Sequence, residues 1–133
     1  MTLHSSLLAA CFAFAVTAGG TAQHATASRA EWTAWLEQLR ATGIDVAVPL
    51  SWRYAFSARD SARLEALSLD LVAAGYAIDA LLPGTAGDTR LGVTRAELLT
   101  PAGLERRSRD LGVLARKHGA RFDGIDVAAS GLR

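Results

Sequence analysis

Residues 45–56, DVAVPLSWRYAF, carry the clearest secondary-structure signal in the chain. Apolar side chains alternate with polar or small ones along this stretch, which is the two-residue period of a β-strand with one buried face. Because Pro49 has no backbone N–H to donate to a neighbouring strand, we expect regular pairing to begin after it, over residues 50–56. The aromatic side chains of the strand then share one face, which we expect to form the core.

A helix is predicted ahead of this strand, over residues 28–43. Ser28 and Glu31 have the spacing of a capping box, which satisfies two free backbone donors at a helix start. Gly43 can end the helix in a left-handed conformation. One stripe of the helix is apolar, and we expect it to pack on the core; it consists of Trp32, Trp35, Leu36 and Leu39.

A second helix and two strands are expected after the central strand. The predicted helix begins at Ser57, has Asp60 in its first turn, where the helix dipole favours an acid, and ends at Gly75. Alternating apolar residues predict a strand over residues 76–82. After a glycine-rich turn, residues 89–98 are expected to form the third strand.

A third helix and a last strand complete the predicted order. Thr100 followed by Pro101 is a typical helix start, and Gly119 is placed to end the helix. Residues 121–127 are expected to form a strand with a bulge at Gly124, where the apolar phase breaks. The inner stripe of the helix is predicted to be Leu104, Ser108, Leu111 and Ala115.

The order of these elements, a helix followed by β-α-β-β-α-β, predicts an α+β fold. We expect the ferredoxin-like arrangement, a four-stranded antiparallel sheet with two helices on one face, plus the extra N-terminal helix. The chain has 133 residues with a formal net charge of +1, which suits one globular domain and gives no general affinity for nucleic acid. Residues 28–133 are therefore predicted to be a single domain.

Residues 1–27 are predicted to be a signal peptide. They contain no charged side chain, and their apolar run, residues 7–16, has the length of a signal-peptide core and is too short to span a bilayer. Ala25-Thr26-Ala27 fits a cleavage site, and Ala22 is a second candidate. A buried apolar helix or a wrongly assigned start codon is the alternative. We expect a periplasmic protein if the leader is removed and a cytoplasmic one otherwise.

No residue pattern predicts a catalytic, metal or cofactor site. His118 is the one histidine of the predicted domain, and a helix-end position near the dipole explains it better than metal ligation. Asp123 and Asp126 could in principle form an acid–base pair, but alternation along a strand would separate them unless the bulge brings them together. The prediction is therefore a protein that is not an enzyme and uses no cofactor and no metal.

A basic helix face is the best candidate for a binding surface. Residues 101–121 contain six Lys or Arg and two acids, a local excess that could meet an acidic protein surface or a phosphate backbone, or simply be solvated. Direct nucleic-acid binding is not expected, because the strand aromatics Tyr54, Phe56 and Phe122 are predicted to face the core. The candidate partner-binding residues are Arg106, Arg109, Arg116 and Lys117.

Residues 114–125, LARKHGARFDGI, resemble the closing segment of the RraB family, the regulators of ribonuclease activity B. Residues 54–57 and 74–76 resemble that family's first strand and the entry to its second, and the similarity covers about residues 28–127. Unlike typical members, which are acidic, this chain is near neutral, and Ile125 stands where a Trp is common in the family.

The resemblance implies a ferredoxin-like fold without enzymatic activity, in which Phe122, Asp123 and Gly124 define the fold. It also implies a regulator that binds another protein, in that family ribonuclease E. We therefore expect a non-catalytic regulatory domain with a protein partner. An exported module that binds an unknown ligand on the same scaffold is the alternative, and a small hydrolase built on Asp123 and Asp126 is a third hypothesis.

Overall fold

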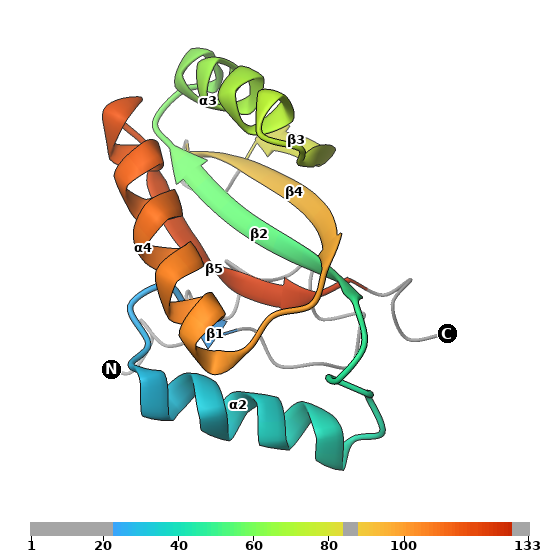
Figure 1. Cartoon of the computed structure of the whole chain (residues 1–133). Helices are drawn as coiled ribbons and strands as arrows, with labels where there is room; N and C mark the ends of the chain where they lie inside the picture. Colours follow the sequence, from blue (N-terminus) through green and yellow to red (C-terminus); the bar gives the residue numbers. More distant parts are fainter. Residues whose placement is uncertain (1–22, 84–87, 129–133) are drawn as a thin grey trace, which may run out of the picture.

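The computed structural model describes residues 23–83 and 88–128, and within them three helices pack against an antiparallel sheet (Figure 1). The elements in chain order are β1 (Gln23–His24), α2 (Arg29–Ala41), β2 (Leu50–Ala58), α3 (Ser61–Ala73), β3 (Ala77–Pro83), β4 (Thr89–Glu97), α4 (Pro101–Lys117) and β5 (Arg121–Val127). The predicted α+β class is confirmed. No helix of these two segments is both long and apolar enough to cross a membrane.

The sheet has five strands, in the order β1-β5-β2-β4-β3, and all neighbours are antiparallel. The prediction of four strands is wrong, because β1 pairs with the outer edge of β5, with Gln23 opposite Ile125. The next residue, Ala25, donates its backbone N–H to the carbonyl of Asp123 at 3.3 Å. A strand of two residues carries no recognisable period, so sequence patterning could not find it.

The core lies on the face of β2 that carries Trp52, Tyr54 and Phe56, all fully buried. Strand β2 is the centre of the sheet and begins at Leu50, the residue after Pro49, as predicted. Leucines from α3 and α4 belong to the same buried cluster, and these are Leu64, Leu67, Leu71, Leu104 and Leu111. Both helices therefore cover one core, which carries most of the apolar burial expected to stabilise the domain.

Helix α2 packs against α4 and brings two tryptophans to the core. The Trp32 and Trp35 rings meet edge to face at 5.6 Å, and Trp35 lies 5.9 Å from Trp52 of the central strand. The capping box between Ser28 and Glu31 is present at the start of the helix. The apolar stripe predicted for this helix is thus core, not a binding face.

The predicted start of the second helix is wrong by three residues, because the cap is Asp60 and not Ser57. Ser57 is not a cap, because it pairs with Arg90 of β4 and Arg121 of β5, so the hydrogen-bonded ladder extends β2 to Ala58. Asp60 caps α3 instead, and its carboxylate accepts the backbone N–H of Arg63 at 3.1 Å. Sheet pairing on both sides outweighs the local capping preference of a serine.

A β-bulge lies in β5, next to the predicted position. Ala55 is paired with Gly124 but Phe56 with Phe122, which leaves Asp123 as the extra residue. The bulge lets Phe122 turn toward the core, where its ring is 5.2 Å from that of Phe56. It also sets the start of β5 against α4, at the position of the candidate site.

Candidate functional site

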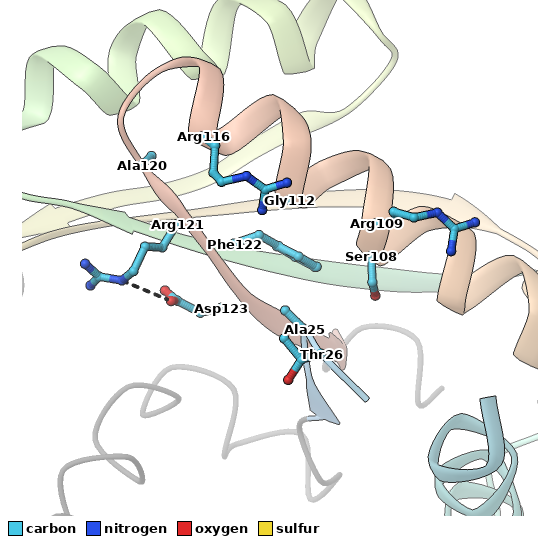
Figure 2. Close-up of a pocket in the computed structure, with 10 residues that line it drawn as sticks. All are labelled: Ala25, Thr26, Ser108, Arg109, Gly112, Arg116, Ala120, Arg121, Phe122 and Asp123. Carbon is cyan, nitrogen blue, oxygen red and sulfur yellow. Dashed lines mark ion pairs between the residues drawn. The ribbon is translucent and has the colours of Figure 1, made fainter. Parts of the chain in front are cut away.

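A groove lies between α4, the start of β5 and the turn after β1 (Figure 2). Its volume is about 370 Å³, within the usual range of ligand pockets. We call it the cationic groove, and its lining residues are Ala25, Thr26, Ser108, Arg109, Gly112, Arg116, Ala120, Arg121, Phe122 and Asp123.

Small residues create the space in this groove. Ser108, Gly112 and Arg116 are four residues apart along α4, so they lie on one side of the helix. A Cβ placed on Gly112 would be in ordinary contact with the Arg116 guanidinium, at 3.5 Å, so the glycine leaves room beside that group. Phe122, with 9% exposure, lies beneath the helix and adds an apolar surface to the groove (Figure 2).

The groove carries three guanidinium groups and one carboxylate. The Arg121 guanidinium is paired with the Asp123 carboxylate, and 3.9 Å separate Arg121 Nε from Asp123 Oδ1. Burial raises the pKa of the Asp123 carboxyl above its ordinary value, against a hydrogen bond from Ser57 that lowers it. Arg109 and Arg116 are exposed and make no ion pair with any described residue. Their charges are therefore available to a ligand.

Ser108 is an unusual feature of the groove. It belongs to the inner stripe predicted for α4, and it is only 6% exposed. Its hydroxyl nevertheless has no hydrogen-bond partner among the described residues. A buried hydroxyl is normally hydrogen-bonded, so the Ser108 hydroxyl is a donor in the groove wall that a ligand could use.

The structure brings together two of the four predicted partner-binding residues. Arg109 and Arg116 line the cationic groove, whereas Arg106 lines a second hollow of about 420 Å³ beside Glu97. Lys117 lies toward α3, with its Nζ 3.9 Å from Asp70 Oδ2. Arg121 also lines the groove, but it is not among the four predicted residues because it belongs to β5 and not to the helix.

Arg107 is not part of the exposed basic face. Its guanidinium donates to the hydroxyl of Tyr76 at 2.6 Å and also bonds to the Glu97 carboxylate. Glu97 in turn accepts the hydroxyl of Tyr54 at 2.7 Å, and burial together with this bond raises the pKa of Tyr54. This network joins β2, β4 and α4, so one of the six basic residues counted in the sequence has a structural role.

His118 follows the last residue of α4, as expected for a helix-end histidine. Its Nε2 lies 2.7 Å from Asp70 Oδ2 of α3, a partner that the sequence did not reveal. The hydrogen bond with His118 lowers the pKa of the Asp70 carboxyl. The pair joins the end of α4 to α3.

The two candidate catalytic carboxyls have separate surroundings. Asp123 faces Ser57 and Arg121, whereas Asp126 is 3% exposed and accepts the backbone N–H of Val127 at 2.8 Å. Burial raises the pKa of Asp126 to about 6. Within residues 23–83 and 88–128 no hydrogen bond joins these carboxyls, and no three His, Cys, Asp or Glu side chains are grouped to hold a metal ion.

The fold and the groove together define a small α+β domain with a groove that three arginines line. The family model described as "Regulator of ribonuclease activity B" matches residues 29–127, which is most of the chain. The chain therefore belongs to the RraB family, a family of regulators, and the resemblance in the sequence is confirmed. No curated protein matches the chain.

Proposed function

We propose that this protein is a non-catalytic regulator that binds a ribonuclease directly and lowers its activity. The observation that carries the proposal is the family match over residues 29–127, which spans all three helices and four of the five strands. A regulator of an enzyme needs a surface for contact and no reactive centre of its own. A ribonuclease of the E type is the partner that the family resemblance favours.

The exposed side of α4 is the contact surface that the side chains support. Val113 is 56% exposed, and Arg109 and Arg116 are its neighbours four residues before and three residues after it on the helix. Arg106 continues the same side, and Lys117 borders it. Arginine is enriched in protein interfaces, and Val113 adds an exposed apolar side chain between the two arginines. We call these residues the α4 face: Arg106, Arg109, Val113, Arg116 and Lys117.

The test is to titrate the purified protein into a cleavage assay of a ribonuclease E-type enzyme from the same organism. We expect the rate of cleavage of a labelled single-stranded RNA to fall, and the two proteins to elute together in size-exclusion chromatography. The protein without the enzyme should leave the RNA intact, which tests the absence of nuclease activity. Unchanged cleavage together with separate elution would refute the proposal.

Which partner the protein can bind depends on whether it stays in the cytoplasm or is exported. The alternative to the ribonuclease partner is an exported module that binds another ligand. We propose that, if a leader is removed, the cut follows Ala22 and not Ala27. The support is that residues 23–27 contribute to the fold: β1 pairs with β5, and Ala25 and Ala27 pack against the core. Mass spectrometry of the native protein from separated cell fractions tests this. Gln23 at the N-terminus of a periplasmic protein would favour an exported binding module, and an uncut chain in the cytoplasm would favour the ribonuclease partner.

A further inference from the structure

We propose that the cationic groove is a carboxylate-binding site that takes an acidic side chain from an extended segment of the partner protein. The inference rests on the proposed function, since it names what the regulator recognises, but it concerns the groove and not the α4 face as a whole. Its basis is the combination of free positive charge, an unpaired buried hydroxyl and vacant volume in one place.

The charge of the groove favours an anion. Arg109 and Arg116 project from α4 along the groove (Figure 2), and neither is in an ion pair with a described residue. The guanidinium of Arg116 lies beside Gly112, 3.5 Å from the place that a Cβ on this residue would occupy. A planar guanidinium matches a carboxylate with two parallel hydrogen bonds, so these groups suit a Glu or Asp side chain.

The buried hydroxyl of Ser108 supplies a fixed donor. Its side chain is more than nine-tenths buried, its Oγ has no partner among the described residues, and it lines the groove. A carboxylate oxygen of the ligand near Ser108 would accept a hydrogen bond from its hydroxyl. This would remove the free-energy cost of leaving a buried hydroxyl without a hydrogen bond. The arginines attract the anion, and the serine hydroxyl favours one position for it.

The apolar part of the groove favours a peptide over RNA. Ala25 is half-buried and offers surface for an apolar neighbour of the acidic residue, with no hydrogen-bonding demand. Phe122 is 9% exposed and Tyr54 and Phe56 are fully buried, so no aromatic ring of these three is available to stack on a base. Residues 1–22 contain no Asp or Glu, so this part of the chain brings no acidic side chain to the groove.

The probe is a short labelled peptide in which glutamate alternates with leucine, and fluorescence anisotropy with the full chain measures its binding. A matched peptide with glutamine in place of glutamate is the control. We expect the glutamine peptide to bind about tenfold more weakly or not at all, because charge-assisted hydrogen bonds to arginine are lost. Equal affinity for the two peptides would overturn the inference.

Three substitutions locate the site. Arg116→Glu should weaken binding of the glutamate peptide by about tenfold or more, whereas Arg59→Glu, the same charge change at an exposed position outside the groove and the α4 face, should leave it nearly unchanged. Gly112→Leu should block the groove without removing a charge. Its midpoint of thermal unfolding should be unchanged or higher, since leucine favours helix more than glycine.

The remaining results separate a carboxylate site in the groove from a general charge effect and from an RNA site. If Arg59→Glu weakens binding as much as Arg116→Glu, the peptide is attracted by the overall charge of the protein and the groove is not the binding site. If single-stranded RNA displaces the peptide, and loses its own affinity on Gly112→Leu, the groove is a phosphate site and the inference fails. If the protein inhibits the ribonuclease but binds no peptide, the inference about the groove is overturned and the proposed function stands. Peptide binding without inhibition supports the groove and overturns the proposed function.

Discussion

The side chain of His118, directly after α4, lies 2.7 Å from the carboxylate of Asp70 in α3, across 48 residues of chain. Lys117 adds a weaker contact with the same carboxylate at 3.9 Å. The two helices that cover the core are therefore also joined at one end by charge. The α4 face lies on the helix that this contact helps to position.

Asp70→Asn should make the stability of the protein less sensitive to acid. The pKa of Asp70 is lowered in the fold, so its ionised form stabilises the folded state at neutral pH, and this contribution is lost as the pH falls below the ordinary value of 3.8. Urea unfolding at neutral and acidic pH measures the effect. Asp45→Asn is the control, because Asp45 is an exposed acid outside this contact. An equal acid dependence in Asp70→Asn and the native protein would contradict the prediction.

Arg107→Ala should destabilise the protein by about 2 kcal/mol, because the largely buried carboxylate of Glu97 loses its direct hydrogen bond and keeps only the longer contact with Arg95 at 3.8 Å. Arg106→Ala, one residue earlier on the exposed side of α4, should change the free energy of unfolding by less than about 0.5 kcal/mol. Chemical denaturation of both variants gives the comparison. Similar values for the two would mean that the Tyr54–Glu97–Arg107 network does not stabilise the fold.

A chain that begins at Ser28 should be less stable than one that begins at Gln23 by about 1–2 kcal/mol. The shorter chain lacks β1, the bond from Ala25 to Asp123 and the packing of Ala27. Unfolding in urea of the two purified chains provides the measurement. If both unfold at the same denaturant concentration with the same slope, β1 does not contribute to the stability of the domain.

Arg109→Glu should weaken capture of the ribonuclease partner and reduce its dependence on salt. Arg109 is exposed and unpaired among the described residues, so its charge is free to act on an acidic partner surface. Affinity measured at low and high ionic strength tests both effects. Arg59→Glu is the matched control, since Arg59 is exposed in the turn between β2 and α3. Equal losses in the two variants would assign the effect to net charge and not to α4.

The sequence by itself determined the elements whose signal lies in consecutive residues. The alternation through residues 50–56 identified β2, the capping box at Ser28 identified α2, and the stripe from Leu104 to Ala115 identified the buried side of α4. These signals are local, because the period of an element and the chemistry of its ends depend on residues a few positions apart. The same locality explains why the RraB resemblance could be recognised from short motifs.

Only the tertiary structure decided which distant residues meet. Strand β1 forms because the edge of β5 offers backbone hydrogen-bond partners. Ser57 belongs to strand β2, and is not a helix cap, because strands β4 and β5 pair with it on both sides. The cationic groove combines side chains of α4 with Arg121 and Phe122 of β5 and the turn at Ala25. Such contacts depend on how elements pack and on where a bulge turns a strand, and these are properties of the whole fold.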